Sequence, residues 1–244
     1  MNRPNLTKTH YILFMKPSKK DHIPLKLPAL NINDKSIKRV YSTKFLGVIL
    51  DEHINWKEHL KLIKDKASKN LGIMYKTKYL LNRQCLKNIY FSFIHTYLNY
   101  CNIAWASTNK THLEKLNNIQ KKVSSIIMDK DMFTEARPLM KDLNILNVYQ
   151  INLFQTLQFM FKLKNEKTPQ VFKTQFAKIQ HRYPTRYSTN NYVIPRTTLR
   201  KTDFAITCRG PSLWNKILPP EIKKHRIHLQ LQVSTETTFT KHAK

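Results

Sequence analysis

Residues 56–74, WKEHLKLIKDKASKNLGIM, carry the pattern that decides the fold class of this chain. Their apolar positions recur every three or four residues, at Trp56, Leu60, Ile63, Ala67, Leu71 and Met74. At about 100° per residue, these positions fall on one narrow stripe of an α-helix. Lys57, Lys61 and Lys64 form a second stripe about a quarter turn away. The segment is therefore predicted to be an amphipathic helix with one apolar face and one basic face.

The residues before this helix are predicted to form short strands. Residues 9–15, THYILFM, are a compact apolar run rich in aromatic and β-branched side chains. Two more strands are expected at residues 37–40 and 44–50, and the short link 41–43 would join them as a hairpin. The N-terminal region is therefore predicted to be β structure.

Three more long helices are predicted downstream, and a last short helix is expected to open at residues 219–221, PPE. The first covers residues 83–98, with inward positions expected at Leu86, Ile89, Tyr90, Phe93, Ile94 and Tyr97. The second begins at residues 111–114, THLE, which have the form of a capping box, and runs to about Met128. A second cap at residues 147–150 precedes residues 151–163, INLFQTLQFMFKL, which are apolar on nearly every face. This last helix is predicted to be buried at the centre or to face a partner.

The whole chain is predicted to have an α+β fold that is mainly α. Residues 1–52 are expected to form short N-terminal β hairpins, and residues 53–130 a helical region. Residues 131–232 would be a second helical region with a basic, aperiodic loop at 181–202, and residues 233–244 a frayed tail. After the loop, residues 203–208 are expected to form a short strand, which Gly210 and Pro211 would end.

The net charge indicates a polyanionic partner. The 244 residues include 43 Lys+Arg and 15 Asp+Glu, for a formal charge of +28. Such a surface attracts nucleic acid, and the affinity is expected to fall steeply with salt. The alternative is that AT-rich coding DNA has biased the composition and that the lysines are simply a solvated surface.

The compartment follows from apolar runs and cysteine usage. No apolar run is long enough for a membrane span or a secretory signal. Cys85, Cys101 and Cys208 are too few and too widely spaced for a disulfide framework. The protein is therefore expected to be intracellular, nuclear or cytoplasmic, with no membrane partner and no secretion.

No catalytic residue and no metal ligand is predicted from the residues themselves. The cysteines lack the CxxC spacing of zinc sites, and no glycine-rich phosphate-binding loop occurs. Asp51 and Glu52 are the one adjacent carboxylate pair. We interpret this pair as a helix-start signal rather than as a metal site.

An ordered set of short phrases goes beyond composition. Residues 5–9, NLTKT, precede the apolar residues 11–14, and residues 45–51, FLGVILD, are followed by Trp56 and His59. Further phrases follow at residues 100–105, 120–122, 183–186 (YPTR) and 210–215 (GPSLWN). In this order and spacing they resemble the C-terminal portion of LINE-type (non-LTR) retrotransposon reverse transcriptases of the jockey-like group, over nearly the whole chain.

The resemblance implies an architecture and a set of nucleic-acid contacts. Residues 5–14 look like the end of the polymerase palm, residues 37–51 like the primer-grip hairpin, and residues from Trp56 onward like the helical thumb. The residues expected to meet the template–primer, RNA or DNA, are Lys8, Lys44, Lys57, Lys61, Lys64, Arg182 and Arg186. The residues expected to be structural in the matched phrases are Gly47, Trp56, His59, Gly72, Gly210 and Trp214.

The resemblance also implies what this chain lacks. RNA-directed DNA polymerases of the family hold Mg²⁺ with aspartates in phrases upstream of N-x-x-K-T, and this chain begins only four residues before Asn5. Nucleotidyl transfer requires carboxylate-bound metal ions. We therefore expect nucleic-acid binding without a cofactor and without polymerase activity by this chain alone. A host-co-opted accessory nucleic-acid-binding protein and a translated relic with no selected role are the alternatives.

Overall fold

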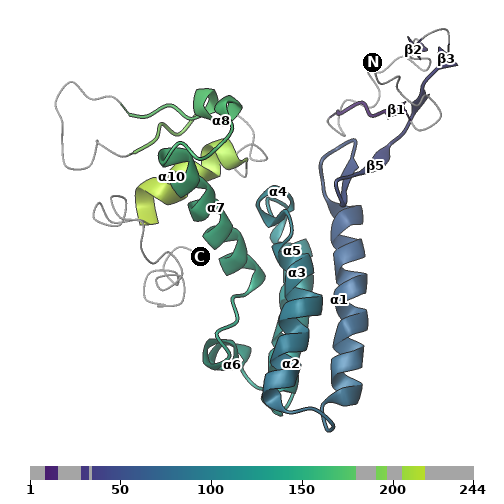
Figure 1. Ribbon diagram of the computed structural model, residues 1–244, viewed down its shortest axis with the longest axis vertical. Helices are drawn as coiled ribbons and strands as arrows, with labels where there is room; N and C mark the ends of the chain where they lie inside the picture. Colours follow the sequence, from purple (N-terminus) through teal and green to yellow (C-terminus); the bar gives the residue numbers. More distant parts are fainter. Residues whose placement is uncertain (1–8, 16–28, 33–34, 180–190, 197–204, 218–244) are drawn as a thin grey trace. The chain divides into compact units, whose positions relative to one another are not determined.

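The computed structural model describes residues 9–15, 29–32, 35–179, 191–196 and 205–217 (Figure 1). The chain is mainly α-helical with a few short strands, as the sequence predicts. It divides into two compact units, residues 1–63 and 64–244. The division falls within the first long helix, α1 (Lys57–Thr77), and each unit is described by itself.

The first unit contains three pairs of short strands. β1 (His10–Tyr11) pairs in parallel with β4 (Lys38–Arg39), and β2 (Asn31–Ile32) pairs antiparallel with β3 (Lys35–Ser36). β5 (Ser42–Phe45) and β6 (Val48–Asp51) form an antiparallel hairpin, with Phe45 opposite Val48. The β structure predicted before Trp56 is therefore present, in shorter strands than expected.

The position of the hairpin turn corrects the prediction. Residues 44–50 were expected to be one strand, but the chain reverses at Leu46 and Gly47, within that stretch. Both residues have positive φ, 45° and 82° respectively, as the two central residues of a type I′ turn require. Leucine rarely adopts this backbone conformation, so the Leu-Gly pair gave no turn signal.

The apolar stripe of α1 is confirmed. Trp56, Leu60, Ile63, Ala67 and Met74 are buried, and Leu71 is half-buried. Lysines occupy the exposed side of the same helix. The burial pattern follows the helical period that the sequence shows.

The second unit is helical beyond α1. Its elements are α2 (Arg83–Tyr90), the π-helix η2 (Phe91–His95), α3 (Thr96–Asn99), α4 (Asn102–Trp105), α5 (Lys110–Ile127), α6 (Ala136–Asp142), α7 (Val148–Lys164), α8 (Gln170–Gln175) and α10 (Ile206–Ile217). α7 packs against α3, α4, α5 and α10, which confirms that residues 151–163 form a central helix (Figure 1).

A π-turn shifts the inward face of the predicted helix at residues 83–98. The buried side chains are Leu86, Tyr90, Ile94 and Leu98, at steps of four residues. Phe93, which was expected to point inward, is 54% exposed. The wider turn of η2 adds a residue to the helical repeat and so rotates the following face.

One of the two predicted caps is confirmed and one is wrong. Asn147 and Gln150 form a reciprocal capping box at the start of α7. α5 instead begins after Asn109, so Thr111 lies inside the helix and caps nothing. Glu114, the expected partner of Thr111, binds Lys121 at 2.8 Å and the hydroxyl of Tyr149 at 2.9 Å.

α10 overturns the predicted strand and break near Pro211. Ile206 onward is helical, and the helix continues through Gly210 and Pro211. A proline inside a helix costs about 3 kcal/mol. Trp214, one turn later, is fully buried, and burial of a large aromatic side chain contributes on the order of 4 kcal/mol. Packing therefore outweighs the local penalty.

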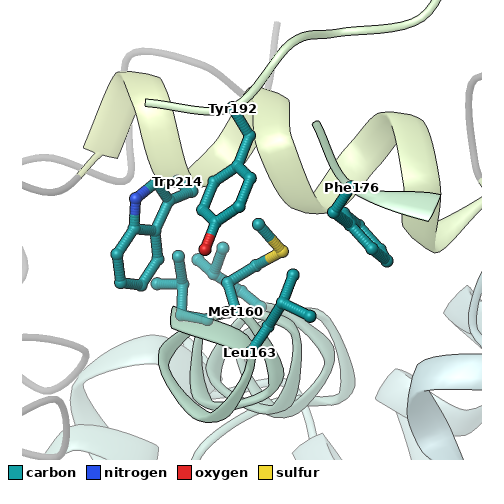
Figure 2. Close-up of a cluster of buried hydrophobic side chains, with 7 residues drawn as sticks. Met160, Leu163, Phe176, Tyr192 and Trp214 are labelled. Atoms are coloured by element: carbon teal, nitrogen blue, oxygen red, sulfur yellow. The ribbon is translucent and has the colours of Figure 1, made fainter. Parts of the chain in front are cut away.

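A hydrophobic cluster joins α7 and α10. Its buried members are Leu153, Leu157, Met160, Leu163, Phe176, Tyr192 and Trp214, and Figure 2 shows these side chains converging. The Tyr192 and Trp214 rings lie edge to face, with centroids 6.3 Å apart. Asn215 fixes Tyr192 by accepting from its backbone N–H at 3.1 Å and donating to its carbonyl at 2.8 Å. Tyr192 thus belongs to the core, although it falls within the predicted basic loop.

Candidate nucleic-acid interface

The Asp51 carboxylate orders the residues that lead into α1. It accepts hydrogen bonds from the backbone N–H groups of His53, Asn55 and Trp56, each with a shortest distance of 3.0 Å. These bonds hold Ile54 and Trp56 at positive φ, 49° and 63°. The backbone N–H of Lys57 then donates to the Asn55 side chain at 2.9 Å. Asp51 therefore orders the residues that lead into α1 without capping the helix itself, because its three N–H donors all precede Lys57.

The Glu52 carboxylate contacts a different pair of side chains. Its buried carboxylate lies 3.2 Å from Nη2 of Arg39 and 3.3 Å from Nε2 of His53. The Arg39 guanidinium also lies over the Tyr41 ring, 5.0 Å from its centroid. The pair Asp51–Glu52 thus organises the junction between β6 and α1.

Trp56 and His59 anchor the first turn of α1. Both side chains are buried, at 8% and 4% exposure. The backbone N–H of Ile49, on β6, donates to Nδ1 of His59 at 3.4 Å. Trp56 is buried against protein, so it is not available to stack on a base.

Three lysines on α1 form an exposed basic surface, which we call the lysine stripe: Lys57, Lys61 and Lys64. At about 100° per residue, they lie within about 60° of one another around the helix axis. Within the described part of the chain, no ion pair joins any of the three to a carboxylate. Lys44 is also exposed, on β5. The stripe is therefore a set of exposed lysines that make no ion pair with any described residue.

The remaining predicted residues divide into three groups. Gly47, with φ of 82°, and Gly210, where an added Cβ would lie 2.7 Å from Sδ of Met160, occupy positions that need glycine. Gly72 does not, because nothing lies within 4 Å of its added Cβ, and that prediction is corrected. Lys8, Arg182 and Arg186 lie outside the described residues.

Sequence reasoning missed an exposed group at the end of α1. Lys78 lies 4.4 Å from the Tyr79 ring centroid and 5.6 Å from that of Tyr75. Hydrogen bonding to Tyr79 raises the pKa of Lys78, and Asp129, 3.5 Å away, raises it further. The interleaving of basic and aromatic residues in 75–79, YKTKY, is the signal that could have found this group.

The described residues offer no cluster suited to metal chemistry. Among them, no group of three His, Cys, Asp or Glu side chains could hold a metal ion. Cys85 and Cys101 are exposed and Cys208 is buried, and all three are free thiols. Among the same residues, no helix is both long and apolar enough to cross a membrane.

No family model, curated protein or solved structure matches this chain.

Proposed function

We propose that this chain binds nucleic acid through the lysine stripe of α1, as the template–primer-binding C-terminal part of a LINE-type reverse transcriptase would, and that it has no polymerase chemistry of its own. The observation that carries the proposal is the stripe itself. Lys57, Lys61 and Lys64 are exposed, have no ion-pair partner in the described chain and share one face of a helix. Lysine ammonium groups at this spacing suit consecutive phosphates.

Two features of the chain support the stripe as a binding surface. The formal charge of +28 draws polyanions to the whole molecule. The backbone N–H groups of Asn55 and Trp56 donate to the Asp51 carboxylate and so order the residues that lead into α1. A surface with fixed geometry loses less conformational entropy on binding than a flexible basic tail would.

The test compares two triple variants of equal net charge. The stripe variant carries Lys57→Gln, Lys61→Gln and Lys64→Gln. The control carries the same change at Lys69, Lys122 and Lys162, which are exposed on α1, α5 and α7. Binding of a labelled duplex is measured against NaCl concentration. We expect the stripe variant to reduce the slope of log K against log salt by about 2 to 3, since each lost phosphate contact removes about 0.9.

The control variant should change that slope much less. Equal losses in both variants would mean that net charge alone drives binding, and the stripe would have no special role. Absence of binding by the unmodified protein at low salt would contradict the proposed function altogether.

The catalytic part of the proposal has its own assay. The purified chain is incubated with a primer–template, deoxynucleotides and Mg²⁺ or Mn²⁺, and we expect no extension of the primer. Extension that persists through further purification would contradict this part and leave the binding proposal intact.

A further inference from the structure

The end of α1 exposes two tyrosines around one lysine, a group we call the Tyr75–Tyr79 patch: Tyr75, Lys78 and Tyr79. The Tyr75 side chain is 55% exposed and the Tyr79 side chain 81%. The Lys78 ammonium lies 5.6 Å and 4.4 Å from the two ring centroids. The centroids of the two tyrosine rings can therefore be no further apart than the sum of these two distances. Two exposed aromatic rings therefore lie beside one largely buried lysine.

The cation in this patch is held in place. The Lys78 side chain is only 18% exposed, and its ammonium group lies beside the Tyr79 ring and the Asp129 carboxylate. Asp129 is itself 82% exposed and offsets part of the lysine's charge. The patch therefore attracts anions less strongly than the lysine stripe does, but it offers more aromatic surface. That combination suits a ligand that offers both phosphates and flat aromatic rings.

We propose that the Tyr75–Tyr79 patch binds single-stranded nucleic acid by stacking unpaired bases on the two tyrosine rings, with Lys78 near the connecting phosphate. Base–aromatic stacking contributes about 1–3 kcal/mol per base and is indifferent to sequence. Duplex bases are already stacked on one another, so a duplex gains little at this patch. The inference rests on the proposed function, and it adds a second surface with a different specificity.

The first experiment places a reporter in the patch. Trp56, Trp105 and Trp214, the three native tryptophans, are all buried, at 8%, 0% and 0% exposure. Tyr79→Trp adds an exposed indole whose emission differs from theirs. We expect oligo(dT) to quench that emission and a duplex of equal length not to. Phe93→Trp is the matched control, since Phe93 is as exposed as Tyr75 but has no cation over its ring in the described chain.

The second experiment measures affinity for oligo(dT) and for the duplex. Tyr79→Ala should weaken oligo(dT) binding about five-fold or more and leave duplex binding unchanged. Tyr79→Phe should restore it, because the ring is retained. Leu80→Ala, at a neighbouring side chain that is 82% exposed, controls for loss of apolar surface and should have no effect. The loss in Tyr79→Ala should also persist at high salt, unlike the loss in the stripe variant.

Three outcomes would overturn the inference. Tyr79→Ala and Leu80→Ala could weaken self-association in sedimentation instead, which would make the patch a protein-docking surface. Tyr79→Ala could leave oligo(dT) binding unchanged while the stripe variant still loses duplex binding, and then the inference fails although the proposed function stands. If the unmodified protein binds neither probe, both fail together.

Discussion

Gly72 and Gly210 show how two glycines in helices can have opposite roles. At Gly210, on α10, an added Cβ would lie 2.7 Å from Sδ of the fully buried Met160. At Gly72, on α1, no atom lies within 4 Å of the added Cβ. The difference comes from tertiary packing, because both positions are helical.

Alanine at these two positions should change stability in opposite directions. Gly210→Ala is expected to destabilise by about 1–3 kcal/mol through overpacking against Met160. Gly72→Ala is expected to stabilise by about 0.5–1 kcal/mol, because alanine loses less backbone entropy in a helix. Urea unfolding followed by far-UV circular dichroism measures both. Destabilisation by Gly72→Ala would indicate a contact that the structure does not show.

His95 is a half-buried histidine that should make stability depend on pH. Its Nδ1 atom has no hydrogen-bond partner among the residues that the structure describes, and its ring packs against Phe91 and Tyr90, with centroids 5.2 Å and 5.9 Å away. Burial lowers the pKa of His95 below its usual value of 6.5. As the pH falls below 6.5, His95 therefore takes up a proton in the unfolded chain before it does so in the folded protein. The free energy of unfolding falls progressively from pH 6.5 down through the lower pKa of the folded state.

The variant His95→Phe should reduce this pH dependence. Phenylalanine keeps a ring in contact with Tyr90 and Phe91 and removes the titrating group. We expect the unmodified protein to lose more unfolding free energy between pH 7.5 and pH 5 than His95→Phe does. Because the chain has ten histidines, the difference between the two proteins is the relevant quantity. Parallel pH profiles would show that His95 does not contribute.

At the scale of elements, the start of α1 depends on one carboxylate. Asp51→Ala removes the acceptor for the backbone N–H groups of His53, Asn55 and Trp56. It also releases Ile54 and Trp56 from left-handed backbone conformations that cost energy to hold. We expect a loss of about 1–3 kcal/mol in the free energy of unfolding.

The matched control for Asp51→Ala is Asp65→Ala, an exposed aspartate on the same helix. It should change stability by less than about 0.5 kcal/mol. Trp56 fluorescence reports the local change near residue 51, and circular dichroism reports the loss of helix. Similar losses in the two variants would mean that Asp51 acts only through its charge.

The hairpin, the π-turn and α10 show why element boundaries were harder to predict than element types. Phe45–Val48 turns through Leu46, Phe93 is rotated outward by η2, and α10 continues past Pro211. For α10, the local preference is overridden by the packing of Trp214 against α7, which is distant in sequence. The capping box at Asn147 was predictable because both of its partners lie within one helical turn.

At the scale of the whole molecule, the charge of +28 should itself oppose folding. The described chain has few ion pairs to offset it, such as Lys121–Glu114 and Lys173–Glu166. Salt screens repulsion between exposed charges. We therefore expect the thermal midpoint to rise by a few degrees between low salt and physiological salt.

Sucrose at matched osmolality is the control for that experiment, because it stabilises proteins without screening charge. Nucleic-acid affinity should fall over the same salt range in which the midpoint rises. A midpoint that falls with NaCl would show that attractive pairs outweigh repulsion in this fold.

The surface chemistry of this protein was visible in the sequence more fully than its packing. The spacing of Lys57, Lys61 and Lys64 on one predicted face needs only the helical period, and the structure shows all three exposed. The Tyr75–Tyr79 patch was missed, although Tyr75, Lys78 and Tyr79 all lie within residues 75–79. Neither surface requires knowledge of what packs behind it.

The sequence by itself determined the mainly helical class, the apolar stripe of α1, the cap of α7 and the excess of positive charge. Each depends on residues within a few positions of one another, or on composition alone. Only the tertiary structure decided that Tyr192 enters the core beside Trp214, that Gly210 must lack a side chain and that α10 passes through Pro211. These outcomes depend on burial against α7, whose contribution exceeds the local backbone preferences and is set by residues far away in the chain.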